Sequence, residues 1–329
     1  MKVLITGASG FLGTNLQHHL RKPREHGCLE IDDSRAHYSI IPVSSKEYDL
    51  RDSYSCKQML WYYKPDVVIH AAGSVGGILA NQQNPGKFMY DNLAMGMNML
   101  ERTRQYRDRF HANSTKFIML GTVCAYPKYT PTPFSESYLW EGYPEETNAP
   151  YGIAKKTLMK LGETYHEQYG LDVINLIPVN MYGPHDHFNV TSSHVIPALI
   201  LKFYNAMKHG CDSVECWGTG AASREFLYAS DCAEAIERAI WAQNVGPEPI
   251  NIGTGKEITI FDLVNEIADQ MGFEGDIVWD KSKPDGQPRR CLNVHRAQER
   301  LGFTAKTDFQ TGLKQTIEWF LQQQQENKV

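Results

Sequence analysis

The sequence of 329 residues predicts an α/β protein with a doubly wound parallel sheet and a smaller C-terminal α/β domain. Strand-like and helix-like patterns alternate from the first residue, which is typical of a parallel sheet with helices on both faces. The composition, 42% hydrophobic and 22% charged, is that of a folded protein. The length corresponds to about two domains.

The elements of the first domain follow one another closely. Apolar runs predict strands at residues 2–6, 66–71, 117–120 and 173–177. Helices are expected at residues 11–21, 92–106 and 151–169. The last of these helices ends at Gly170, a residue type that commonly follows a helix C-terminus.

The pattern becomes less regular after Tyr182-Gly183-Pro184. Short strands and helices are predicted there at residues 192–209, 214–217, 230–243, 250–252 and 261–271. We therefore expect a first domain at residues 1–183 and a second at residues 184–329, with segments around 212–255 returning to the first.

Charge and cysteine content exclude several classes of protein. The net charge is −5 without a long block of either sign, so binding to nucleic acid or to an anionic membrane is not expected. No apolar run approaches the ~20 residues that cross a bilayer. The seven cysteines form no Cys-x-x-Cys motif, which favours free thiols in the cytoplasm.

His185 and His187 lack accompanying carboxylates or thiols, so we expect no metal and place both in a loop lining the substrate pocket.

Three glycines stand between the first strand and the first helix, in Gly7-Ala-Ser-Gly10-Phe11-Leu12-Gly13. At such a junction the backbone approaches a pyrophosphate and the helix N-terminus faces it. The motif therefore predicts a Rossmann-type dinucleotide site in the first domain, which leaves substrate binding to the second.

Two candidates for the second strand give different cofactors. If residues 28–31 form it, Asp32 follows and its carboxylate favours NAD by binding the ribose 2′-hydroxyl. If residues 38–43 form it, Ser44, Ser45 and Lys46 follow and favour NADP(H). We favour the second candidate because residues 49–52 resemble the segment that passes under the adenine shortly after this strand. The expected cofactor contacts are Gly7, Gly10, Phe11, Leu12, Gly13, Ser44, Lys46, Asp49, Leu50, Ala71, Ala72, Tyr151 and Lys155.

A tyrosine and a lysine share one face of the helix at residues 151–169. The spacing of Tyr151 and Lys155 places the phenol and the ammonium within reach of each other. A nearby ammonium favours phenolate, so we expect a lowered pKa for Tyr151, suited to proton exchange with a carbonyl or alcohol. Thr122 lies just past a buried strand, where parallel sheets place ligand contacts.

These residues and the glycine loop resemble the extended short-chain dehydrogenase/reductase superfamily. Shared motifs are Ala71-Ala-Gly73, Asn92 with Gly96 and Asn98, Asn180-Met-Tyr-Gly-Pro184, and Arg224-Glu-Phe226 with Asp231. More specific motifs are similar to the GDP-L-fucose synthase family over nearly the full length: Val75-Gly-Gly-Ile78, Cys124-Ala-Tyr-Pro-Lys128, Gly183-Pro-His-Asp186 and Ser193-His-Val-Ile-Pro-Ala198.

The resemblance implies an NADPH-dependent 3,5-epimerase/4-reductase of a GDP-4-keto-6-deoxy-hexose, active as a homodimer. It assigns Cys124 and His194 to the epimerisation, and Thr122, Tyr151 and Lys155 to the reduction. It places Asn180, Lys202, Trp217, Arg224 and Arg290 at the substrate, with the basic residues suited to its diphosphate.

The sequence departs from the family at two positions near the pocket. Val123 stands where the family has a serine, and Ser74 stands where it has a lysine. Alternatives therefore stay open: a single-function 4-ketoreductase or epimerase on another GDP-sugar, such as a heptose, and a dinucleotide-binding protein without catalysis.

Overall fold

The computed structural model describes residues 1–22, 38–112, 114–190, 193–283 and 285–326. Its larger sheet has six parallel strands in the order β2-β1-β3-β4-β5-β9. Their bounds are β1 (Lys2–Thr6), β2 (Ser39–Val43), β3 (Val67–His70), β4 (Lys116–Leu120), β5 (Asp172–Pro178) and β9 (Ile250–Ile252). This arrangement confirms the predicted fold class.

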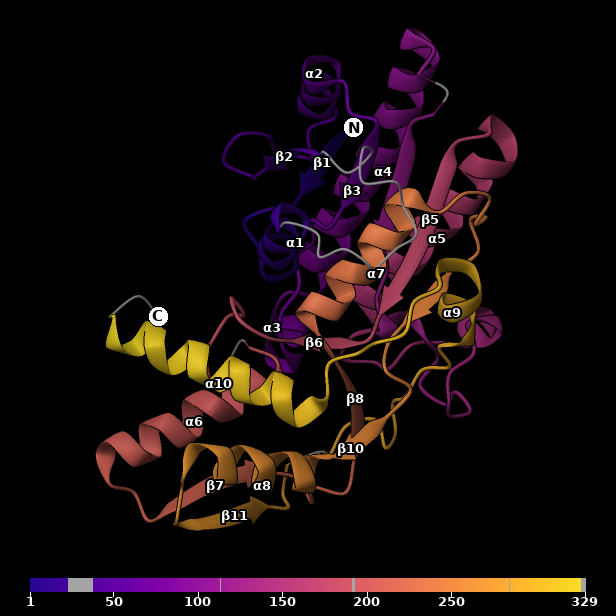
Figure 1. Cartoon of the computed structure of the whole chain (residues 1–329). Coiled ribbons are helices and arrows are strands. Elements are labelled where there is room, and N and C mark those ends of the chain that lie inside the picture. Colours follow the sequence, from indigo (N-terminus) through magenta and orange to yellow (C-terminus); the bar gives the residue numbers. More distant parts are fainter. Residues whose placement is uncertain (23–37, 113, 191–192, 284, 327–329) are drawn as a thin grey trace.

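Helices cover both faces of this sheet (Figure 1). They are α1 (Phe11–Arg21) and α7 (Ala229–Trp241), which pack together, and α2 (Ser53–Tyr63), α4 (Pro85–Phe110) and α5 (Ala149–Tyr169), which form the other layer. Two short helices, α3 (Ile78–Gln83) and α9 (His295–Leu301), complete this part. Helix α4 begins earlier than predicted because Pro85 suits the first turn of a helix.

The second strand is the one that ends before Ser44. Residues Lys2 to Thr6 pair in parallel with Ser39 to Val43, which confirms the strand predicted at residues 38–43. The competing candidate, residues 28–31 with Asp32, lies outside the described residues.

The order of the strands reverses around β1. The chain passes from β1 to β2 on one side and then returns to β3 on the other. In open parallel sheets the loops diverge at this point and leave a crevice at the carboxyl ends of the strands. The glycine loop after β1 and Ala71 after β3 both lie at this edge.

The rest of the chain builds a smaller body below the sheet in Figure 1. It contains a three-stranded sheet of β10 (Glu257–Thr259), β8 (Ser223–Tyr228) and β6 (Asn180–Tyr182), and the parallel pair β11 (Asp276–Asp280) and β7 (Ser213–Trp217). Its helices are α6 (Val195–His209), α8 (Ile260–Met271) and α10 (Phe309–Gln325).

Each body has its own hydrophobic cluster. The larger cluster lies around the six-stranded sheet and includes residues of α7 and β9. The smaller cluster joins α6, α8 and α10 to β8. On these two cores we propose a division close to the expected residue 183, with β6 in the smaller body and α7 and β9 in the first domain.

Candidate functional site

The glycine loop after β1 fits a dinucleotide pyrophosphate. Gly7 has a φ of 68°, and a side chain there would approach the Cα of Ala72 to 2.7 Å, so the loops after β1 and β3 touch. Gly10 begins α1 without any side-chain cap. The first N–H groups of α1 are therefore available to an anion, as a pyrophosphate site requires.

The end of β2 carries the residues predicted for the 2′-phosphate. Lys46 is exposed, while Ser44 donates from both its N–H and its hydroxyl to the carboxylate of Glu47, each at 3.1 Å. A phosphate at Ser44 therefore has to displace Glu47. The following segment is held by Asn98 of α4, whose amide donates to the carbonyls of Leu50 (3.0 Å) and Arg51 (2.9 Å).

Asp49 is already paired in this segment. Arg51 donates to its carboxylate at 2.7 Å, and this hydrogen bond lowers the pKa of Asp49 to about 2. Asp49 therefore stays ionised at neutral pH, beside an arginine side chain that is nearly half exposed.

Thr122, Cys124 and Tyr151 meet at the end of β4. Thr122 begins a 3₁₀ turn over Val123–Ala125, where its hydroxyl accepts from the N–H of Cys124 at 3.2 Å. Helix α5 packs against this turn and brings the Tyr151 hydroxyl to Thr122 and close to Cys124. The structure thus unites three residues that the sequence predicts together.

The expected direction of the Tyr151 pKa is wrong. Burial, with Cys124 nearby, raises the pKa of Tyr151, and the hydrogen bond to Thr122 opposes this only in part. Lys155 makes no contribution, because its Nζ donates instead to the carbonyl of Leu120 at 3.1 Å. Tyr151 is therefore a protonated phenol at neutral pH, the form that can donate a proton.

Lys155 is almost completely enclosed. Its exposed fraction is 3%, and burial lowers its pKa to about 8. A side chain at Gly73, after β3, would come within 3.7 Å of its Nζ. The lysine therefore lies next to the loops of the expected cofactor site.

The pKa of Lys155 is about 8 in the folded protein and 10.5 in the unfolded chain, so burial of the charged ammonium destabilises the folded state. Replacing Lys155 by methionine should therefore stabilise the fold at pH 7 by up to about 3 kcal/mol. The unfolded chain binds more protons between these values, so native stability rises with pH across that window. The difference in the free energy of unfolding between Lys155→Met and native protein should therefore decrease from pH 8 to 10.5. Urea unfolding at several pH values measures it, and a variant less stable at pH 7 would contradict this expectation.

His194 stands at the start of α6, and its side chain is exposed and makes no capping hydrogen bond. Desolvation of the ring by neighbouring protein atoms and the charge of Arg290 lower its pKa. The protonated fraction that can act as an acid therefore grows as pH falls below neutrality.

Arg224 and Arg290 bring two cations to the same place. Arg224 donates to the carbonyls of Ser223 (2.7 Å) and Gln287 (2.6 Å). Burial lowers its pKa to about 10, and the nearby charge of Arg290 acts in the same direction. Arg290 is 8% exposed and its Nη1 lies 3.7 Å from the sulfur of Cys124.

The other predicted substrate residues lie on the second domain or beside it. Lys202 of α6 donates to the carbonyl of Glu215 at 2.6 Å, and Trp217 is half exposed at the end of β7. Asn180 of β6 donates to the carbonyl of Glu225 at 3.1 Å. Glu225 is fully buried, and its carboxylate accepts hydrogen bonds from the N–H groups of Gly255 and Leu292. Its role is therefore structural.

His185 lies between two aromatic rings, and its pocket role stays a prediction. Its ring packs between His18 of α1 (4.8 Å between centroids) and Trp319 of α10 (5.0 Å), so it links these two helices. Within the described ranges, no three His, Cys, Asp or Glu side chains are grouped as metal ligands. In the same ranges, no helix has the length and apolar character to cross a membrane.

Sequence reasoning missed Gln287. This buried amide accepts from Nε (3.2 Å) and Nη2 (3.0 Å) of Arg290 and donates to the carbonyl of Lys128 (2.8 Å). It lies three residues before Arg290, but a neutral amide carries no chemical signal in a sequence.

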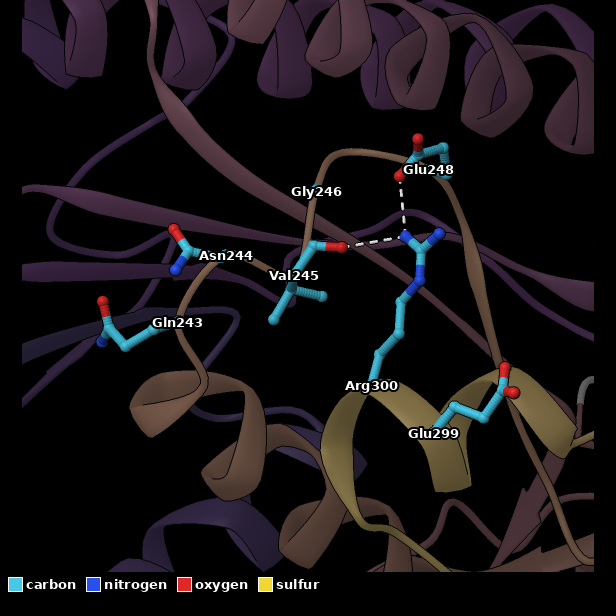
Figure 2. A pocket seen from close by; sticks show the side chains of 7 residues that line it. All are labelled: Gln243, Asn244, Val245, Gly246, Glu248, Glu299 and Arg300. Atoms are coloured by element: carbon cyan, nitrogen blue, oxygen red, sulfur yellow. Dashed lines mark hydrogen bonds and ion pairs between the residues drawn. The ribbon is translucent and has the colours of Figure 1, made fainter.

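A separate pocket lies at the far end of α7 and contains none of these residues. Figure 2 shows Arg300 there, donating to the carbonyl of Val245 (2.8 Å) and paired with Glu248 (2.7 Å). Its cation is thus already neutralised, and the pocket offers no reactive group.

Comparisons with known proteins agree with this geometry. A family model described as NAD dependent epimerase/dehydratase family matches residues 3–253. The chain is 36% identical to the GDP-L-fucose synthase of Escherichia coli (strain K12), covering 98% of this chain and 97% of that protein.

Two solved structures share the whole fold. A GDP-L-fucose synthetase from Naegleria fowleri bound to NADP superposes with a TM-score of 0.84 at 28% identity, over 100% of this chain and 96% of that one. A GDP-mannoheptose C4 reductase from Campylobacter jejuni with NADP bound superposes with a TM-score of 0.81 at 26% identity, over 97% of this chain and 98% of that one. These findings confirm the resemblance predicted from the motifs, and the chain belongs to the NAD dependent epimerase/dehydratase family.

Proposed function

We propose that this chain is an NADPH-dependent 3,5-epimerase/4-reductase of a GDP-4-keto-6-deoxy-hexose, forming GDP-L-fucose or a close relative. The observation that carries the proposal is the meeting of Thr122, Cys124 and Tyr151 at the end of β4, with Arg290 of the second part of the chain against Cys124. These neighbouring residues thus include groups for proton removal at carbon and for proton delivery to oxygen.

Reduction of the ketone requires a hydride and a proton. NADPH, when bound, supplies the hydride. Tyr151 donates the proton to the ketone oxygen, because its raised pKa keeps the phenol protonated. Thr122 accepts or donates a hydrogen bond beside it, and the ammonium of Lys155 stabilises negative charge in this enclosed region.

Epimerisation requires an acid and a base on opposite faces of the sugar. Carbons next to a ketone lose a proton readily, because the electron pair of the C–H bond passes to the carbonyl oxygen. Cys124 takes the proton and His194 delivers one from the other side. The ketone oxygen that receives negative charge is the same oxygen that Tyr151 later protonates.

The substrate's diphosphate binds on the second domain. Arg224 suits this role because its guanidinium is buried beside a second arginine, so an anion relieves their repulsion. Lys202 and Trp217 extend the site toward the nucleoside, while Asn180 and Arg290 border the sugar.

Lys46 and Ser44 bind the 2′-phosphate of the cofactor. Lys46→Ala should lower kcat/KM for NADPH about tenfold or more, since a charge-assisted hydrogen bond contributes about 1.5–3 kcal/mol. The value for NADH should hardly change. Lys57→Ala, an exposed lysine on α2, is the control. Native enzyme that uses NADH as well as NADPH would instead favour Asp32.

Two further features complete the proposal. Tyr90 and Met97 of α4 are 66% and 44% exposed and seven residues apart, so one helix face presents apolar surface suited to a homodimer. All six cysteines in the described part are free, which favours the cytoplasm.

A panel of 4-keto sugars carried by GDP, UDP and dTDP, incubated with NADPH and followed by NMR, tests the function. We expect turnover of the GDP sugar with inversion at C3 and C5. Reduction without inversion would favour the alternative, a single-function 4-ketoreductase such as the heptose enzyme that shares the fold.

A further inference from the structure

Cys124 is in contact with a buried guanidinium. Nη1 of Arg290 lies 3.7 Å from Sγ of Cys124, within hydrogen-bond range for sulfur. Arg290 follows β11 in the chain, whereas Cys124 follows β4, so the contact joins the two parts of the protein. An N–H group of arginine donates more strongly to a thiolate than to a thiol, because the acceptor is then charged.

Gln287 fixes the orientation of this guanidinium. Its Oε1 accepts from two nitrogens of Arg290, Nε at 3.2 Å and Nη2 at 3.0 Å. Its own amide is anchored on the carbonyl of Lys128 at 2.8 Å. With the Nε–Nη2 edge of the guanidinium held by this oxygen, Nη1 is left directed at the sulfur.

The charge of Arg290 has no carboxylate to neutralise it within the ranges that the structure describes. The charged or titratable groups that act on Cys124 or its arginine come from four elements: Tyr151 of α5, Arg224 of β8, His194 at the start of α6, and Arg290 itself. A buried cation without a counter-ion is costly, and a thiolate at Cys124 would supply the missing negative charge.

We propose that Arg290 is a positioning residue that holds Cys124 as a thiolate. The neutral side-chain amide of Gln287 orients the guanidinium of Arg290 for this role. The inference rests on the proposed role of Cys124 as the base. The thiolate takes a proton from the carbon next to the ketone, and the C–H electron pair moves to the carbonyl oxygen. Cys124 is then a thiol, and it regains its charge by releasing that proton to water or back to carbon. A neutral glutamine leaves the arginine charge available, which a glutamate at the same position would cancel.

The pH profile of Cys124 alkylation tests this proposal. The full-length native protein and Arg290→Met are treated with iodoacetamide at a series of pH values, and modification of each cysteine is read by peptide mass spectrometry. We expect the midpoint for Cys124 to move up by about one pH unit or more in Arg290→Met, as expected for a lost charge-assisted hydrogen bond. Arg290→Lys should recover part of this shift, and Gln287→Met should shift the midpoint in the same direction by less.

One variant and two other cysteines of the chain serve as controls. Arg289→Met removes a neighbouring positive charge that pairs with Glu257 on the surface, and it should leave the Cys124 midpoint unchanged. Exposed Cys211 reports on reagent activity, and buried Cys232 reacts only if a variant unfolds. Coinciding profiles for native protein and folded Arg290→Met, or an equal shift in Arg289→Met, would overturn the proposal.

Failure of the proposed function is a different result. If native protein does not exchange substrate protons in deuterated water, Cys124 is not the base, whatever its alkylation profile. If exchange occurs and the midpoint does not depend on Arg290, the function stands and the positioning role of Arg290 is wrong.

Discussion

Tyr151→Phe is expected to lower the rate of NADPH oxidation by about a thousandfold, within the range typical for loss of a general acid. The hydroxyl is the group that protonates the ketone oxygen, and its raised pKa keeps it in the donating form. The loss of NADPH absorbance in the presence of the 4-keto sugar measures this rate. Part of the C3 and C5 proton exchange should survive, because proton removal from carbon depends on other residues.

The matched control is Tyr62→Phe on α2, where the side chain is 75% exposed. It should oxidise NADPH at the native rate. Tyr151→Phe acting at a rate near that of the control would exclude the phenol as the proton donor.

Cys124→Ser should reduce proton exchange at C3 and C5 by about a hundredfold or more, since a hydroxyl is a far poorer base than a thiolate at neutral pH. The fold and NADPH binding should be preserved, because the substitution removes no large group. The NMR signals of the two protons, followed in deuterated water without NADPH, give the exchange rate.

Cys211→Ser, at an exposed thiol just after α6, serves as the control and should exchange like native enzyme. An unchanged exchange rate in Cys124→Ser would assign the base to another residue and leave Cys124 a packing role.

The sequence predicted what depends on local patterns. The glycine loop, the strand ending before Ser44 and the lysine one turn after Tyr151 are short-range features, and the structure contains each of them. Thr122 was predicted from its place just past a strand of the parallel sheet, whereas Cys124 was predicted from the resemblance to the GDP-L-fucose synthase family.

The features that sequence analysis missed depend on contacts between distant segments. The spacing of Tyr151 and Lys155 does not reveal that Leu120 accepts the lysine's hydrogen bond, so the predicted pKa shift had the wrong direction. The packing of His185 between His18 and Trp319 was not predicted, because both partners lie on helices far away in sequence. The hydrogen bonds between Arg290 and Gln287 pair two residues whose contact a sequence cannot show.

The most direct measurement of the central claim is proton exchange by native enzyme in deuterated water, with the GDP-4-keto-6-deoxy sugar and first without, then with, NADPH. If one site performs both reactions, C3 and C5 should acquire deuterium before the cofactor is added, and the reduced product should carry deuterium at both carbons. Rapid NADPH oxidation with no deuterium at either carbon would contradict the account and define the protein as a 4-ketoreductase alone.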